Sequence, residues 1–252
     1  MMKTIVVGDV HGCLDELVSL VQKTGYRQGI DRLILAGDLV DRGPDSPGVV
    51  RYAMSIGAEA VMGNHDHKLL RRAKHMEKAA ANPSYQIPMQ PDKDQQATIA
   101  MLGEKERAWL ESLPNYIMLE EYNTVVAHAG MVPEVPLEKQ NERVYQMIRF
   151  VKNGTTKMQA MLMPGFIQPP DTYFWAEKWN GPFDIVFGHH VVGNTPQIWE
   201  NNGHKAIGID TGCVFYGMLT AMVFNTDGTR EFVQVGHKPS FYPAELYYKE
   251  TL

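Results

Sequence analysis

The sequence predicts an α/β fold in which helices cover a mostly parallel sheet. Three features carry this prediction: short apolar runs rich in β-branched residues, amphipathic stretches between these runs, and a polar turn after each run. The alternation of strand and helix along the N-terminal part of the chain favours parallel strands joined by helical crossovers.

The first strand is expected over Lys3–Val7, a β-branched run that ends at Gly8. The helix after it is indicated by one apolar stripe with helical spacing, formed by Leu14, Leu17, Val18 and Val21. Gly25 is the expected stop of this helix, because glycine commonly follows the last helical turn.

The next expected strands are Arg32–Ala36 and Glu59–Met62, with a short helix between them that ends near Ile56. A long helix begins near Asn64. The following segment, Ala79–Asp94, contains three prolines and little apolar content, which predicts a long loop. Loops of this length are usually functional or mobile.

Helices are expected from about Gln95, over Glu104–Ser112 and over Lys139–Val151. The remaining strands are predicted at Tyr116–Leu119, Thr124–Ala127, Asp184–Phe187, Lys205–Ile209, Met218–Phe224 and Glu231–Val235. The sequence Asn-Thr-Asp-Gly at residues 225–228 predicts a hairpin turn between the last two strands. We expect residues 1–252 to form a single domain, with cap or insert segments at about 79–100 and 153–182.

Four aromatic residues in the second insert have two interpretations: they stack on a bound base, or they pack beneath a loop. Packing is favoured for at least two of them. The residues are Tyr173, Phe174, Trp175 and Trp179.

Composition excludes several classes of protein. At 252 residues and 44% hydrophobic content, the chain is able to bury a full core. A net charge of -5 argues against stable nucleic-acid binding. No apolar run is long enough to span a membrane, and the N-terminus shows no signal-peptide pattern. A cytoplasmic protein with reduced thiols at Cys13 and Cys213 is therefore expected.

Asp, His and Asn gather in five turns, each of which follows an apolar run. The turns are Gly8–Gly12, Gly37–Gly43, Gly63–Asp66, His128–Gly130 and Gly188–His189. Each turn alone has a commoner explanation, such as a surface histidine, a helix cap or a buried histidine. Five such turns in one chain favour a shared purpose, which is to hold polar ligands around metal at the ends of neighbouring strands.

The donor types predict two divalent cations. Asp9 and His11 point the same way from an extended strand end, and Asp38 follows the neighbouring strand, where it is the natural bridge between two metals. The second mixed site is predicted from Asn64, His128 and His189. Carboxylate and imidazole without thiolate suit manganese first, with iron, zinc or cobalt as alternatives, rather than calcium or structural zinc.

Two cations of this kind activate a bridging water and clamp a phosphoryl group. Arg42 is predicted to bind the phosphate through its forked guanidinium. His65 lies beside the predicted ligand Asn64 and is expected to act as the general acid, with Asp41 as the partner that orients it. His190 follows a predicted ligand and is expected either to line the substrate pocket or to support that ligand.

The motifs resemble those of the calcineurin-like metallophosphoesterases, in the branch of the serine/threonine phosphoprotein phosphatases. Gly-Asp-x-His-Gly, Gly-Asp-x-x-Asp-Arg-Gly and Gly-Asn-His-Asp occur in that order and precede two later histidines. The resemblance implies a four-layer sandwich of two mixed β-sheets flanked by helices. It implies the same metal ligands, His65 as proton donor and Arg149 as a second phosphate-binding arginine.

Further segments resemble bacterial symmetrical diadenosine tetraphosphatases and their relatives. These segments are Trp109–Pro114, Val186–His189 and Ile209–Cys213. The expected substrate is a dinucleoside polyphosphate, with a phosphoprotein or a small phosphomonoester as the alternative. A phosphodiesterase and a non-catalytic scaffold are weaker hypotheses, the latter because no ligand of the motif is missing. Selectivity is expected to come from the two inserts, because the five turns handle only the phosphoryl group.

Overall fold

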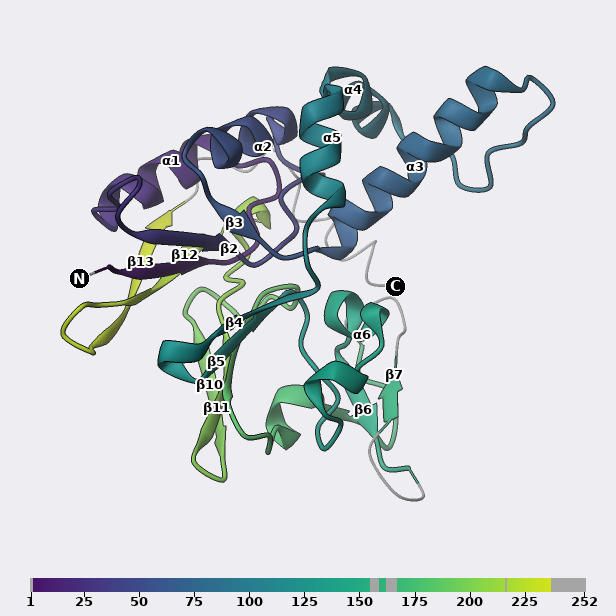
Figure 1. Ribbon diagram of the computed structural model, residues 1–252. Coiled ribbons are helices and arrows are strands. Elements are labelled where there is room, and N and C mark those ends of the chain that lie inside the picture. Colours follow the sequence, from purple (N-terminus) through teal and green to yellow (C-terminus); the bar gives the residue numbers. More distant parts are fainter. Residues whose placement is uncertain (1, 155–158, 162–166, 216, 237–252) are drawn as a thin grey trace.

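Two five-stranded mixed sheets stack face to face at the centre of the molecule (Figure 1). The computed structural model describes residues 2–154, 159–161, 167–215 and 217–236. The first sheet has the order β13 (Arg230–Gly236), β12 (Met218–Phe224), β1 (Thr4–Val7), β2 (Arg32–Leu35) and β3 (Glu59–Ala60). The second has the order β10 (Gln197–Asn201), β11 (His204–Gly208), β9 (Asp184–Phe187), β5 (Thr124–Ala127) and β4 (Tyr116–Leu119).

The prediction of a mostly parallel sheet is correct only for part of each sheet. Strands β1, β2 and β3 run parallel to one another, as do β5, β9 and β11. The neighbours β12, β13, β4 and β10 pair antiparallel. Hairpin geometry explains the β12–β13 pair, because the predicted turn at residues 225–228 joins two consecutive strands and such strands pair antiparallel.

Alternating side chains bury both faces of the central strands. In β1, Ile5 and Val7 pack toward the helices, whereas Val6 packs toward the second sheet. In β9, Val186 belongs to the same layer between the sheets. Burial on both faces matches the continuous apolar runs seen in the sequence, since a strand covered on both sides has no solvent-facing positions.

Helices cover the outer face of the first sheet (Figure 1). They are α1 (Leu14–Lys23), α2 (Ser46–Ser55), α3 (Asn64–Ala81), α4 (Lys93–Met101) and α5 (Glu104–Glu111). Two are capped by aspartates: Asp45 accepts from the Gly48 N–H at the start of α2, and Asp92 accepts from the Gln95 N–H at the start of α4. The loop expected over Ala79–Asp94 is shorter than predicted, because both helices extend into it; α3 projects outward to reach it (Figure 1).

The outer face of the second sheet is covered by shorter elements. They are α6 (Glu142–Met147), the 3-10 helix η3 (Trp175–Lys178) and a small sheet of β7 (Gln159–Met161), β6 (Phe150–Lys152) and β8 (Tyr173–Phe174). The remaining 3-10 helices are η1 (Glu120–Tyr122), η2 (Leu137–Lys139) and η4 (Cys213–Phe215). The two-sheet α/β fold class expected from the sequence is thus confirmed.

Several elements of this half differ from prediction, among them the strands β6, β7 and β8, which were not predicted. The helix expected over Lys139–Val151 is much shorter, because Ile148 is extended and the next residues pair with β8. Strand β10 was not predicted; most of its side chains are exposed at the sheet edge, so its apolar pattern is weak. Of the four aromatics in the second insert, Phe174, Trp175 and Trp179 are buried, as the packing interpretation expected.

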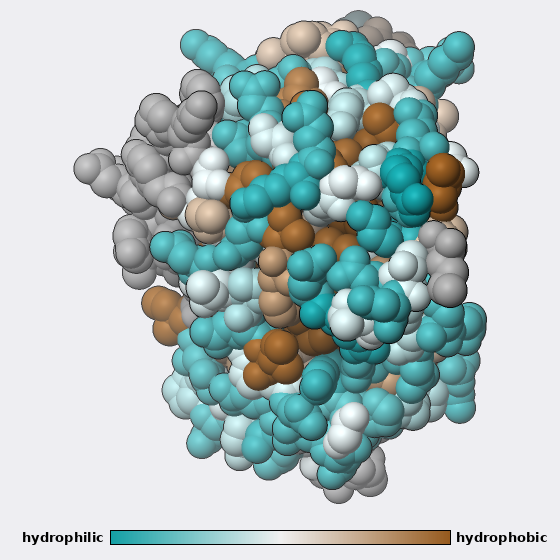
Figure 2. All heavy atoms as spheres, turned by 90° about the vertical axis from the view of Figure 1, so that its left-hand side faces the viewer, coloured by the Kyte–Doolittle hydropathy of each residue, from teal (hydrophilic) through white to brown (hydrophobic). Residues whose placement is uncertain are grey.

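The surface is mostly hydrophilic on the side seen from the left of Figure 1, with apolar residues gathered near its middle (Figure 2). Within the described ranges, no helix combines the length and the apolar character that a membrane span requires.

The backbone at Gly130 lies against the Trp175 indole, and its φ of +131° is a backbone angle that residues other than glycine rarely adopt. We expect Gly130→Ala to lower the free energy of unfolding by about 1–3 kcal/mol, because the added methyl overlaps the ring. Denaturant unfolding followed by tryptophan fluorescence measures the change. Gly203→Ala is the control, since Gly203 also has a positive φ but nothing lies within 4 Å of the added methyl. Equal free energies of unfolding for the two variants would contradict the close contact between Gly130 and the Trp175 ring.

Candidate metal centre

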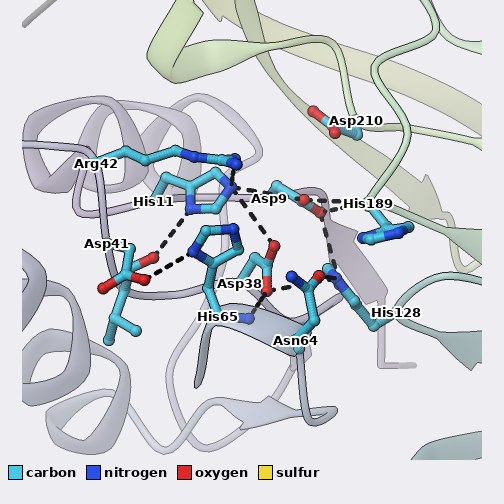
Figure 3. Close-up of polar contacts among 12 residues, drawn as sticks. Asp9, His11, Asp38, Asp41, Arg42, Asn64, His65, His128, His189 and Asp210 are labelled. Atoms are coloured by element: carbon cyan, nitrogen blue, oxygen red, sulfur yellow. Dashed lines mark hydrogen bonds and ion pairs between the residues drawn. The ribbon is translucent and has the colours of Figure 1, made fainter. Parts of the chain in front are cut away.

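Six parallel strands deliver polar residues to one place, three from each sheet. In the first sheet, β1 leads to Asp9 and His11, β2 to Asp38, and β3 to Asn64. In the second sheet, β5, β9 and β11 lead to His128, His189 and Asp210. Because the carboxyl ends of parallel strands share an edge, the two sheets present these residues to each other (Figure 3).

Asp210 was not predicted as part of the site. It is buried beside the other carboxylates and accepts a hydrogen bond of 3.0 Å from the Gly212 N–H. Burial raises the pKa of Asp210 to about 6. The signal was present in the sequence, since Asp210 follows an apolar strand and lies two residues before a glycine, as His128 does.

Several turns at the site hold non-glycine residues in left-handed conformations. His11, Asp38 and His189 have φ angles of 46°, 48° and 64°, and Asp41 and Arg42 have angles of 69° and 74°. Such conformations cost energy and gather at functional sites, where the surrounding structure enforces them. Here the backbone of one turn holds the next: the His11 N–H donates to the Asp38 carbonyl at 2.8 Å.

Two groups of donor atoms share Asp38. His11, Asp38 and His65 form the first group, and Asp38, His128 and His189 form the second; within each group the donor atoms lie within 4.8 Å of one another. The Asp38 carboxylate is therefore the donor common to both groups. Among the described residues, Asp9 belongs to neither group, but its Oδ2 lies 3.9 Å from His11 Nε2 and its Oδ1 lies 3.9 Å from His128 Nδ1.

The imidazoles point their Nε2 atoms into the cluster. His11 Nδ1 lies 2.9 Å from the Val40 carbonyl and His128 Nδ1 lies 2.8 Å from the Ala36 carbonyl, contacts that require a proton on Nδ1. His128 Nε2 then faces oxygen atoms, Asn64 Oδ1 at 2.9 Å and Asp38 Oδ1 at 3.4 Å. The buried Nε2 of His189 has no hydrogen-bond partner among the described residues. Lone pairs that converge in this way fit a bound cation.

Burial and mutual repulsion set the protonation of the cluster. Burial, with repulsion from Asp210, raises the pKa of Asp9. Burial also opposes ionisation of Asp38, but the surrounding histidines outweigh it and hold its pKa well below the ordinary value. Burial lowers the pKa of His11 to about 3, and that of His189 also falls well below its usual range. At neutral pH these two rings are therefore neutral, as metal ligands must be.

His128 behaves differently. Burial favours its neutral form, but Asp38 and Asp9 outweigh burial and raise its pKa to about 10. In the chain alone, a proton on His128 therefore supplies the positive charge that the two carboxylates attract. A metal ion bound by the same atoms would take over that role, since a cation and a proton compete for one lone pair.

Arg42, the predicted phosphate-binding arginine, contacts the predicted metal ligand His11. Its Nη1 is 2.8 Å from His11 Nε2, and its guanidinium lies 5.1 Å from the centre of the Phe215 ring. The guanidinium thus occupies the lone pair that His11 would give to a metal (Figure 3). A metal held by His11 requires this side chain to turn away, and Arg42 already borders a cavity beside the cluster.

His65 and Asp41 form the pair expected from the sequence, and Gln95 adds an unpredicted third member. His65 Nδ1 lies 2.8 Å from Asp41 Oδ2, and Gln95 Nε2 donates to the same oxygen at 2.8 Å. All three side chains are buried. Burial opposes ionisation of Asp41, but the hydrogen bonds from His65 and Gln95 outweigh it and lower its pKa. Gln95 comes from α4, so no local motif pointed to it.

Asp66 supports the turn that carries Asp38. Its Oδ1 accepts from the backbone N–H groups of Leu39 and Val40 at 2.9 and 3.3 Å, and its Oδ2 accepts from the Gly63 N–H at 3.1 Å. The side chain has no exposed surface. One carboxylate thereby ties the turn after β2 to the start of α3.

Arg149 and His190 lie beside the predicted ligand His189. Arg149 Nη2 donates to the His189 carbonyl at 3.2 Å, which places a guanidinium at the rim of the cluster. The His190 ring lies 4.6 Å from the Phe174 ring and borders a second cavity. Burial lowers the pKa of His190 to about 4, with a further contribution from Arg149.

The model of the calcineurin-like phosphoesterase family matches residues 2–217, which is most of the chain and includes all six strand ends. The chain belongs to this family. This phosphoesterase is therefore a hydrolase, and its family implies divalent metals at a cluster such as the one described.

Relatives of this phosphoesterase match it along nearly their whole length. It is 31% identical to bis(5'-nucleosyl)-tetraphosphatase PrpE [asymmetrical] of Oceanobacillus iheyensis, over 95% of this chain and 94% of the relative. It is 29% identical to a symmetrical bis(5'-nucleosyl)-tetraphosphatase of Vibrio parahaemolyticus, over 87% and 94%. A crystal structure of a candidate diadenosine tetraphosphatase is 32% identical, with a TM-score of 0.75 and 95% coverage of both chains.

We expect Asp66→Asn to lower the free energy of unfolding by about 1–3 kcal/mol, because the new amide turns a donor toward buried backbone N–H groups. Thermal unfolding at neutral pH measures the loss. Asp15→Asn is the matched control: Asp15 also lies in the first turn of a helix, but it is exposed. If both variants lose the same small amount, Asp66 acts only through the helix dipole and does not secure the turn.

Proposed function

We propose that this phosphoesterase hydrolyses the anhydride bonds of dinucleoside polyphosphates with two divalent metals, manganese by preference. The observation that carries the proposal is the pair of donor groups that share Asp38, the first of which contains His65 with its buried partner Asp41. Relatives named as bis(5'-nucleosyl)-tetraphosphatases, which this chain matches along most of its length, support the choice of substrate.

The metal ligands divide into two sets. Asp9, His11 and Asp38 would hold one cation, with Asp9 Oδ2 at 3.9 Å from His11 Nε2, while His65 of the same donor group is assigned to proton transfer. Asp38, Asn64, His128 and His189 would hold the other. Oxygen and nitrogen donors without thiolate suit manganese, and also iron, zinc or cobalt. When bound, such a pair of cations supplies a water nucleophile and neutralises phosphoryl charge.

The surrounding side chains bind and orient the phosphate. Arg42 contacts His11 and Arg149 contacts the His189 carbonyl, so each guanidinium borders the donor cluster and would bind a phosphate held there. The Asn64 amide, directed into the cluster, is a further donor to phosphate oxygen.

His65 donates the proton that the leaving oxygen needs. Its Nδ1 is held by Asp41, so Nε2 is the atom that faces the substrate. Gln95 positions Asp41 from the other side. Gln95, Asp41 and His65 are thus joined by hydrogen bonds, through which α4 fixes the orientation of the His65 imidazole.

The product assay tests the proposal directly. Metal-stripped protein should leave diadenosine tetraphosphate and p-nitrophenyl phosphate intact, and added Mn²⁺ should restore cleavage of both. Two molecules of ADP as products would match the symmetrical relatives, as the sequence resemblance implies, whereas AMP and ATP would match the asymmetrical ones. Full activity in chelator would overturn the two-metal mechanism. Brisk turnover of a phosphopeptide, with no cleavage of the dinucleotide, would replace the substrate proposal.

If His65 protonates the leaving oxygen, the loss of kcat on its replacement should depend on how basic that oxygen is. His65→Asn should lower kcat for phenyl phosphate, whose leaving oxygen is basic, by about 10²–10⁴-fold, and kcat for p-nitrophenyl phosphate by much less. Gln95→Leu should show the same selective loss at smaller size, whereas Gln96→Leu, its exposed neighbour on α4, should show none. Metal content, measured by atomic emission, should stay near normal in all three. Loss of metal from His65→Asn would reassign His65 as a ligand.

A further inference from the structure

A cavity of about 310 Å³ lies on the far side of His189 from the His65 pair, and nothing in the proposed reaction uses it. One wall is aromatic, formed by Phe150, Phe174 and Trp199, with the His190 ring against Phe174. The Phe174 and Trp199 rings lie 5.1 Å apart. The volume is in the range of small-ligand sites.

Polar groups border the aromatic wall. The side chains of Gln168, Glu177 and Gln197 line the cavity with it. Gln168 is oriented by its own hydrogen bond to the Thr172 carbonyl. Flat rings together with amide and carboxylate groups match a planar heterocycle, because the rings contact its face and the polar groups contact its edge.

The cavity is attached to the reaction centre at two points. His190 directly follows His189, and the turn between them is tight, since the His190 N–H donates to the Gly188 carbonyl at 2.7 Å. Phe150 directly follows Arg149, whose guanidinium binds the His189 carbonyl. A molecule whose phosphate lies at Arg149 therefore has this cavity close by, lined by the residue that follows Arg149.

The cavity on the other side of the cluster has a different character. It has about the same volume, and its lining includes Arg42, His65, Lys68, Asp94 and Gln95. No aromatic side chain other than the His65 imidazole lines it among the described residues. The two sides of the reaction centre thus differ, one charged and one aromatic.

We propose that the aromatic cavity binds a purine base of the substrate, stacked on Trp199 and Phe174, with the base edge toward Gln168 and Gln197. The proposal rests on the proposed function, which supplies a substrate with nucleosides at both ends. It assigns the base to a site formed by Phe174 and Gln168 of the second insert and by Trp199 and Gln197 of β10, so one of the aromatics that pack beneath the insert also contacts the ligand.

Trp199→Ala removes the stacking surface at a half-buried position. We expect the KM for diadenosine tetraphosphate to rise about tenfold, since stacking of a base on an aromatic side chain contributes on that scale. Trp199→Phe should restore most of the affinity. Ile198→Ala is the matched control: Ile198 is the next residue on β10, points to the other face of the strand and is 50% exposed. Kinetics on p-nitrophenyl phosphate should be unchanged in all three variants.

Inhibition separates this inference from the proposed function. ADP and pyrophosphate are tested as competitive inhibitors of p-nitrophenyl phosphate hydrolysis. Trp199→Ala should weaken ADP about tenfold and leave pyrophosphate unchanged, whether or not the enzyme cleaves the dinucleotide. Equal inhibition of wild type and variant by ADP would overturn the base site. Absence of dinucleotide cleavage by the wild type, with the ADP effect intact, would overturn only the proposed substrate.

Discussion

Burial of the Asp9 and Asp38 carboxylates at the junction of the two sheets is the constraint on which the rest of the structure depends. Carboxylates in such a place require polar partners, because desolvation of the ionised form is costly. Backbone donors supply some of them: the His189 N–H donates to both oxygens of Asp9, at 3.0 and 3.1 Å, and the His65 N–H donates to Asp38 Oδ1 at 2.8 Å. The imidazoles supply the rest. Each carboxylate therefore binds the backbone of a turn from another part of the chain, so the site also stabilises the contact between these turns.

The strained turns follow from the same constraint. A side chain that follows a parallel strand would normally continue outward, whereas His11, Asp38 and His189 must turn back toward a common centre. Left-handed backbone achieves this reversal within one residue. Asp66 and the carbonyls that orient the imidazoles keep the turns in place, so the geometry of the site is built from the backbone as much as from the side chains.

Local sequence patterns predicted the strands and the polar residues at the strand ends. The strands Tyr116–Leu119, Thr124–Ala127, Asp184–Phe187 and Met218–Phe224 were predicted with the observed bounds. The residues in the five turns were predicted because they combine an apolar run, a glycine and a donor side chain. Asp210 shares this pattern, and the segment Ile209–Cys213 resembles the diadenosine tetraphosphatases. A single aspartate in a turn is nevertheless too common to predict a site residue by itself.

What the sequence did not reveal depends on packing between distant segments. Gln95 reaches Asp41 across 54 positions, and glutamine on a helix has no periodic signal of its own. Strand β10 has few buried positions, so its alternation is hidden. The contact of Arg42 with His11 depends on residues that only the folded chain brings together, so no local sequence pattern indicates it. Both inserts approach the reaction centre through such long-range contacts, which leaves substrate choice outside the motifs.

The contact between His189 and Asp9 joins residues 180 positions apart. During synthesis, the first sheet lacks β12 and β13 and the reaction centre lacks His189 and Asp210 until the ribosome has passed the second insert. Closing so long a loop is entropically expensive and slow, so the catalytic apparatus is among the last parts of the protein to form. A nascent or truncated chain that ends before β9 leaves Asp9 without its backbone donors, and activity therefore reports on completed folding rather than on early structure.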